Sequence, residues 1–249
     1  MESEFTEFSY GFALTRELVD TDPASIFSAP VFPSLSQEGQ PGGGYDLQLD
    51  FGFFLFLQFK QAEYMIGGQA GEVDLLGLPY YRFGLMPRYR SLQHQMLLEL
   101  ENYGELVFYA APRFYLQEAF NTAFANSSII ASSIFVQPAA IGPVDDDDQH
   151  YVVYNDAETS FQSEIRKIKS AGREVIIHAA TGSSRQAEPV TKVAQKLREI
   201  VQRHREKDAS EILLSPRERS ISQDLRDISF IAHAFFHCEV IFSPQKKSL

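Results

Sequence analysis

The fold follows from one stretch of the sequence, Gly42-Gly43-Gly44-Tyr45-Asp46-Leu47-Gln48-Leu49-Asp50-Phe51-Gly52-Phe53-Phe54-Leu55-Phe56-Leu57-Gln58-Phe59-Lys60. Apolar and polar residues alternate over 45–50, which is typical of a strand with one solvent-exposed face. Residues 53–57 are all large and apolar, as in a strand that is covered on both faces. Asp50, Phe51 and Gly52 between the two runs suit a three-residue loop, because glycine adopts the left-handed conformation that such a loop needs. We therefore predict a β-hairpin.

The register of this hairpin decides which side chains share a face. The register that keeps one face apolar places Asp46 opposite Phe56, on the same face as Gln58 and Lys60. A lysine at the end of so apolar a strand is costly unless an anion meets it. The hairpin therefore predicts a site in which a carboxylate, an amide and an ammonium group converge.

This arrangement resembles the PD-(D/E)XK nuclease superfamily, in the branch where glutamine replaces the second acidic residue. Asp46 and Gln58-Phe59-Lys60 match the family pattern, and the resemblance covers roughly the first 115 residues. It implies an α/β fold with a restriction-endonuclease-like core, made of a helix, a mixed sheet with a central hairpin, a second helix and a further strand. It also implies a metal-dependent phosphodiesterase, in particular a DNA endonuclease of restriction or antiphage defence.

The resemblance implies a role for each site residue. Asp46, the Gln58 amide oxygen and the Phe59 carbonyl would bind Mg²⁺ or Mn²⁺. Magnesium keeps several water ligands, one of which could become the attacking hydroxide. Lys60 would orient that water or stabilise the charge that grows on the phosphate. Because glutamine replaces an acid, the metal affinity should be lower than in the acidic branch.

A glutamate on the first predicted helix is a further candidate. Residues 4–19 show amphipathic spacing, and Glu7 lies near the edge of one apolar stripe. The resemblance implies that Glu7 holds metal-bound water. The alternative is a solvated glutamate that the helix dipole favours in the first turn.

The segment after the hairpin predicts a helix between Ser91 and Gly104, followed by a strand over 105–111. Some relatives in the family use a glutamine on this helix. Gln93 and Gln95 are both candidates to face the site, and the sequence does not choose between them.

The second half of the chain suggests an α/β extension. The acidic run Asp145–Asp148 marks a domain boundary, with a nuclease-like core over 1–143 and an extension or second lobe over 149–249 that could continue the core sheet. The predicted elements of the extension are strands at 151–154, 174–178, 212–214 and 239–242 and helices at 158–170, 188–206 and 222–236.

Histidines near the end of the chain raise the question of a second metal site. His233 and His237 lie four residues apart, a spacing that can bind zinc, and Cys238 follows directly. Apolar neighbours surround them, so we predict packed histidines at a helix end instead.

Composition sets the class of protein and its surroundings. The 249 residues are 44% hydrophobic and 13% aromatic, which indicates a globular chain able to bury a sizeable core. One cysteine excludes an internal disulfide and suits the cytoplasm, and no apolar run predicts a membrane span. The net charge of −11 argues against indiscriminate nucleic-acid binding, although residues 161–249 hold 16 of the 22 Lys and Arg residues.

Two other functions stay open. A nuclease-like fold with a neutral Gln58 could serve as an inactive binding or scaffold module that acts with a partner protein such as a helicase, an ATPase or a sensor. An active nuclease of this size could need such a partner too, or form a homodimer. The third reading is an unrelated α/β protein in which the motif arises by chance.

Overall fold

A computed structural model describes residues 1–21, 51–68, 70–157, 159–161, 166–181, 186–204 and 221–244. Asp46, the predicted first half of the hairpin and the predicted strand at 212–214 lie outside these residues. Within the described part of the chain, no helix has the length and apolar character needed to cross a membrane.

The central sheet has the strand order β10-β1-β4-β5, and a short strand, β9, pairs with the start of β1. β1 (Phe51–Phe59) runs parallel to β4 (Leu106–Pro112) on one side and antiparallel to β10 (Glu239–Pro244) on the other. β5 (Ser133–Val136) is antiparallel to β4, and β9 (Glu188–Pro189) is antiparallel to β1. β1 is therefore paired along both of its edges.

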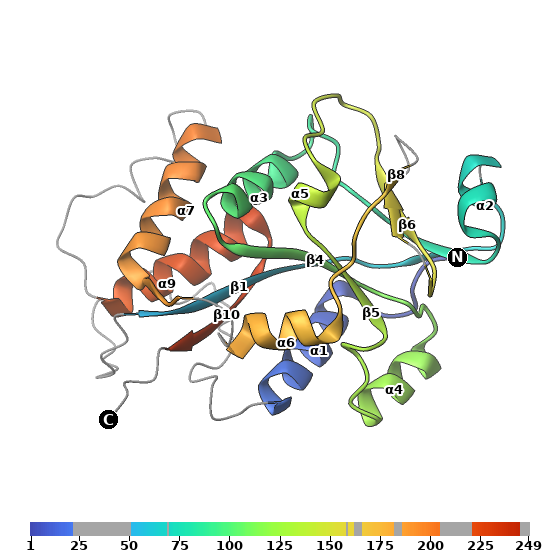
Figure 1. Cartoon of the computed structure of the whole chain (residues 1–249), viewed down its shortest axis with the longest axis horizontal. Helices are drawn as coiled ribbons and strands as arrows, with labels where there is room; N and C mark the ends of the chain where they lie inside the picture. Colours follow the sequence, from blue (N-terminus) through green and yellow to red (C-terminus); the bar gives the residue numbers. More distant parts are fainter. Residues whose placement is uncertain are drawn as a thin grey trace.

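Helices cover both faces of this sheet, as Figure 1 shows. α3 (Gln93–Asn102), α7 (Val190–His204) and α9 (Ile221–Ile231) lie on one face. α1 (Glu7–Thr21) and α6 (Arg173–Thr181) lie on the other. The α/β fold class is confirmed, in the form of a mixed sheet between two helical layers.

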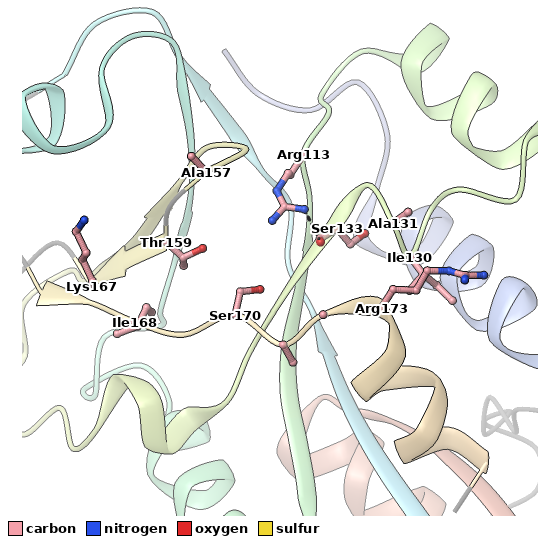
Figure 2. A pocket seen from close by; sticks show the side chains of 12 residues that line it. Arg113, Ile130, Ala131, Ser133, Ala157, Thr159, Lys167, Ile168, Ser170 and Arg173 are labelled. Atoms are coloured by element: carbon pink, nitrogen blue, oxygen red, sulfur yellow. Dashed lines mark hydrogen bonds between the residues drawn. The ribbon is translucent and has the colours of Figure 1, made fainter. Parts of the chain in front are cut away.

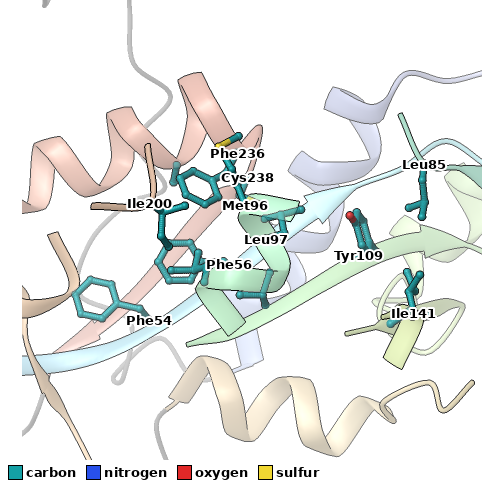
Figure 3. Close-up of a cluster of buried hydrophobic side chains, with 14 of the residues drawn as sticks. Phe54, Phe56, Leu85, Met96, Leu97, Tyr109, Ile141, Ile200, Phe236 and Cys238 are labelled. Carbon is teal, nitrogen blue, oxygen red and sulfur yellow. The ribbon is translucent and has the colours of Figure 1, made fainter. Parts of the chain in front are cut away.

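The two faces of β1 explain why the run at 53–57 is apolar throughout. Phe54 and Phe56 point into the core under α3, α7 and α9 (Figure 3), and they are at most 2% exposed. Leu55 and Leu57 point into the opposite core under α1 and α6 and are fully buried. A strand buried on both faces was predicted for this run, and it is confirmed.

A second, antiparallel sheet lies beside the first, with the strand order β2-β3-β6-β7-β8. Its strands are β2 (Glu63–Met65), β3 (Tyr80–Gly84), β6 (Tyr151–Tyr154), β7 (Thr159–Phe161) and β8 (Arg166–Lys167). The remaining helical elements are α2 (Ala70–Leu76), α4 (Gln117–Ala125), α5 (Pro138–Ile141) and the π-helical turn η3 (Ala232–Phe236).

The predicted hairpin loop is wrong. Phe51 and Gly52 belong to β1, where Phe51 pairs with Pro189 and Gly52 pairs with both Glu188 and Pro244. The glycine is needed for a close approach between strands, because a side chain at this position would collide with the ring of Phe242.

The predicted register is wrong as well. Phe56, which was expected to face Asp46, pairs with Val240 of β10 on one edge and with Val107 of β4 on the other. Both edges of β1 are occupied at this point, so no hairpin partner can add there. The antiparallel neighbour of β1 comes from the far end of the chain, and residue patterns near β1 do not reveal such a distant partner.

Two further elements differ from the prediction. Residues 158–170 were expected to form a helix, yet 159–161 and 166–167 are strands β7 and β8, and Thr159 and Phe161 of β7 are buried. Residues 174–178 were expected to form a strand and lie in α6, where Ile176, Ala179 and Ala180 form a buried helical face. Packing against the sheet decides the outcome here over the β-propensity of a Val-Ile-Ile run.

Residues beyond the acidic run at 145–148 contribute to both sheets. β9 and β10 pair with β1, and β6 pairs with β3. α7 and α9 close the core over Phe54 and Phe56. The central strand of the fold therefore depends on residues from the last quarter of the chain.

Gly52→Ala tests the close approach between β1 and β10. An added Cβ would lie 2.0 Å from a ring carbon of Phe242 and 2.9 Å from the Ser243 carbonyl oxygen. We expect the free energy of unfolding to fall by about 1–3 kcal/mol, the usual cost of overpacking a core. Urea unfolding measures it, with Gly67→Ala as the control, because a Cβ at Gly67 meets nothing within 4 Å. Equal stability of the two variants would contradict this packing.

Candidate functional site

The candidate site lies where the parallel strands β1 and β4 end. Lys60 directly follows β1, and its backbone N–H donates to the Ala110 carbonyl of β4 at 2.9 Å. In open α/β sheets, ligands bind at the carboxyl ends of the strands. Gln58 and Lys60 are therefore placed at the edge of the sheet where a ligand is expected.

Lys60 is a buried cation. Lys60 is 8% exposed, and its ammonium nitrogen lies 5.6 Å from the centre of the Tyr109 ring. No carboxylate among the described residues lies within 4 Å of that nitrogen. Burial lowers the pKa of Lys60, against the smaller opposing effects of Glu7 and Cys238. A positive charge at this position is costly without an anion, so the site is suited to receive one.

Gln58 is held in place by a second glutamine. Its amide oxygen accepts a hydrogen bond from Gln93 Nε2 at 2.7 Å, and its own Nε2 donates to the Phe59 carbonyl at 2.9 Å. Gln93 Nε2 also donates to the Phe236 carbonyl at 3.0 Å. Of the two candidate glutamines on this helix, Gln93 reaches the site, whereas Gln95 donates to the carbonyl of Val144.

A buried histidine fixes the tyrosine beneath Lys60. His94 Nε2 lies 2.8 Å from the Gly142 carbonyl oxygen, and His94 Nδ1 lies 2.8 Å from the Tyr109 hydroxyl oxygen. A carbonyl can only accept, so Nε2 carries the proton and Nδ1 accepts from the tyrosine. Burial lowers the pKa of His94, and the charge of Lys60 adds to this effect against the opposing bond to Gly142. His94 and Tyr109 are therefore a neutral pair whose hydrogen bond holds the Tyr109 ring in place beneath Lys60.

Glu7 lies at the start of α1, next to the end of β1. Its carboxylate accepts the backbone N–H of Gln61 at 3.2 Å, and it is close enough to Lys60 to oppose the lowering of the lysine pKa. The side chain is exposed. Glu7 therefore lies at the rim of the site. Its exposure agrees with the alternative interpretation, a solvated glutamate in the first turn of the helix.

The segment before β10 also borders Lys60, which the sequence did not predict. His237 adopts the left-handed conformation with a φ of 51°, and both burial and the charge of Lys60 lower its pKa. The Cys238 thiol is buried, and burial raises its pKa. Only the pairing of β10 with β1 brings these residues to the site, so no local sequence signal could have identified them.

The described residues by themselves do not form a metal centre. Among residues 1–21, 51–68 and the later described ranges, no group of three or more His, Cys, Asp or Glu side chains could hold a metal ion. The two oxygens expected to bind Mg²⁺, on Gln58 and Phe59, each accept a hydrogen bond already. The prediction that His233 and His237 are packed is wrong, because both are exposed. His233 Nδ1 lies 3.6 Å from Glu239 Oε1, and Cys238 is packed in the core.

Lys60→Met tests the cost of the buried charge. Because burial lowers the pKa of Lys60, the unfolded chain binds this proton more tightly than the folded chain does. The free-energy cost of burying the charged lysine is therefore largest at pH values below the lowered pKa of the folded protein. It disappears as the pH rises to the pKa that Lys60 has in the unfolded chain. We expect Lys60→Met to be more stable than wild type at pH 7, with a gain that shrinks towards pH 10.

Urea unfolding at both pH values measures the difference. Lys192→Met is the matched control, because the Lys192 side chain is 61% exposed and should show no comparable gain. A Lys60→Met protein that is less stable than wild type at pH 7 would show that the ammonium group is satisfied within the fold.

No protein-family model, curated protein or solved structure matches the chain. The resemblance to the PD-(D/E)XK superfamily therefore rests on the motif residues themselves.

Proposed function

We propose that this protein is a phosphodiesterase that acts on DNA, most simply an endonuclease of restriction or antiphage defence in the cytoplasm. The observation that carries the proposal is Lys60, a buried ammonium group at the carboxyl end of β1 with no described carboxylate partner. A phosphodiester is a compact anion of the kind that such a group binds.

Lys60 would act on the charge that develops during cleavage. As a nucleophile attacks phosphorus, negative charge builds on the non-bridging and leaving oxygens. An ammonium group fixed in a site of low dielectric stabilises that charge more strongly than solvent does. Binding of the phosphate would also favour the charged form of Lys60, because an adjacent anion counters the effect of burial on its pKa.

The neighbouring residues would position this group. Gln93 Nε2 is anchored by its bond to the Phe236 carbonyl and donates to the amide oxygen of Gln58, which fixes that side chain two residues before Lys60. The His94–Tyr109 pair fixes the ring that lies beneath the ammonium group. Pre-organised groups of this kind need little reorganisation when the transition state forms.

The proposal includes a divalent metal, for which Asp46 is the expected carboxylate ligand. Asp46 lies outside the described residues. Bound Mg²⁺ or Mn²⁺ would supply Lewis acidity and an activated water in such a site. For Gln58 to contribute its oxygen, the hydrogen bond from Gln93 would have to be shared or released.

The second candidate is an inactive binding module that keeps the fold and acts with a partner protein or a second copy of itself. The specific observation in its favour is that the oxygens of Gln58 and Phe59 are already used in hydrogen bonds. This candidate predicts binding without turnover.

Cleavage of plasmid and oligonucleotide DNA in the presence of Mg²⁺ or Mn²⁺ tests the proposal. We expect Lys60→Met to lower the cleavage rate about 10²–10³-fold, as is usual when a charge-stabilising group is removed. Asp46→Asn, which removes the proposed metal ligand, should abolish the metal-dependent cleavage, and Lys192→Met should cleave at the wild-type rate. Chelation with EDTA should stop the wild-type reaction.

The outcomes separate the two candidates. DNA binding that weakens in Lys60→Met, with no cleavage by wild type under any metal condition, would favour the binding module. Cleavage that persists undiminished in Lys60→Met would place the chemistry elsewhere in the protein and overturn the proposal.

A further inference from the structure

A cavity of about 520 Å³ opens beside the carboxyl end of β4, away from the Gln58–Lys60 pair. It is lined by residues that follow β4, precede β5, end the β6–β7 turn and connect β8 to α6 (Figure 2). Its size falls within the range of about 300–1,000 Å³ that is usual for small-molecule sites. None of the roles proposed above uses it.

Arg113 is the central polar group of this cavity. Figure 2 shows its side chain between the β6–β7 turn and the start of β5, with Lys167 and Arg173 on opposite sides of the view. Arg113 Nη1 donates to the Ser133 carbonyl at 2.9 Å, while its Nε is buried without a hydrogen-bond partner. Among the described residues, no carboxylate lies within 4 Å of the guanidinium group. Arginine therefore keeps unused donors in a partly buried position.

The described part of the cavity wall carries cationic side chains. Among the described residues that line it are Arg113, Lys167 and Arg173, and none of those described residues is an aspartate or glutamate. Glu17 lies behind this wall, where it accepts the backbone N–H of Ile130.

Two other donors are available at the same wall. The Ser170 hydroxyl accepts the backbone N–H of Phe135 at 3.1 Å, so its own hydrogen is free to be donated. Gly172 and Arg173 form the start of α6, whose first N–H groups have no acceptor within the helix. Helix N-termini favour anions through these groups and through the helix dipole.

We propose that this cavity binds the phosphate group of a nucleotide-sized ligand, with Arg113 as the main anchor. The guanidinium group can bind two phosphate oxygens at once, and Ser170 and the start of α6 can donate to the third. The ligand is either a free nucleotide or the phosphorylated end of a nucleic-acid strand, because both present the same group. The site is independent of the proposed nuclease chemistry at Lys60.

Isothermal titration calorimetry with inorganic phosphate, 5′-AMP and a short oligonucleotide with or without a 5′-phosphate tests the proposal. We expect saturable binding to the wild-type protein and a loss of affinity of about 10- to 100-fold in Arg113→Gln, typical of removing a charge-assisted hydrogen bond. Arg113→Lys should show an intermediate loss. Lys192→Gln, which makes the same change of charge at an exposed position, should bind as wild type does.

The comparison of ligands identifies the source of the phosphate. Tighter binding of 5′-AMP than of the phosphorylated oligonucleotide indicates a free nucleotide, and the reverse order indicates a nucleic-acid end. Lys60→Met should keep the affinity for 5′-AMP and the difference in affinity between oligonucleotides with and without a 5′-phosphate, even if it lowers DNA cleavage and overall DNA binding. Thermal unfolding of each variant shows whether it is folded. If Arg113→Gln is not folded, the affinity of Arg113→Lys decides the test.

Two results would overturn the proposal. One is the absence of saturable binding of every phosphate ligand to the wild-type protein at millimolar concentration. The other is wild-type affinity in a folded Arg113 variant, which would place the binding at another part of the surface.

Discussion

The burial of β1 is the constraint on which the rest of the structure depends. Phe54 and Phe56 need one helical layer, and Leu55 and Leu57 need another. A strand covered on both faces must also satisfy its backbone groups along both edges, because no water reaches them. β4 and β10 supply those partners, so three distant parts of the chain must meet before this strand is stable.

This constraint also determines where the polar residues lie. The strand alternation that buries Phe54 and Phe56 continues through Gln58 to Lys60, which carries an amide and an ammonium group into the same partly enclosed layer. Gln93 donates one hydrogen bond to the Gln58 amide oxygen. The Lys60 ammonium nitrogen lies 5.6 Å from the centre of the Tyr109 ring, and no carboxylate among the described residues lies within 4 Å of it. The amide is therefore part of the hydrogen-bonded framework, whereas the ammonium group has no counter-ion among the described residues.

The C-terminal quarter of the chain completes the sheet and also anchors it electrostatically. Lys196 of α7 is buried between Glu105, which precedes β4, and Glu188 of β9, at 2.5 and 2.8 Å. Both glutamates raise the pKa of Lys196 against the effect of burial. Lys60 and Lys196 are buried to a similar extent. They differ in that two carboxylates pair with Lys196, whereas no carboxylate among the described residues lies within 4 Å of the Lys60 nitrogen.

The sequence by itself determined the apolar strand, most of the helices that cover it and the shared face of Gln58 and Lys60, because periodicity records burial. The exception among the helices is α6, which the sequence predicted as a strand. The sequence could not choose Gln93 over Gln95, since that depends on how α3 is rotated against the sheet. It gave the wrong partner for β1, because strand pairing between residues 51–59 and 239–244 leaves no local pattern. Only the tertiary structure brought His237 and Cys238 beside Lys60 and opened the cavity at Arg113, because both arise from segments that meet across the fold.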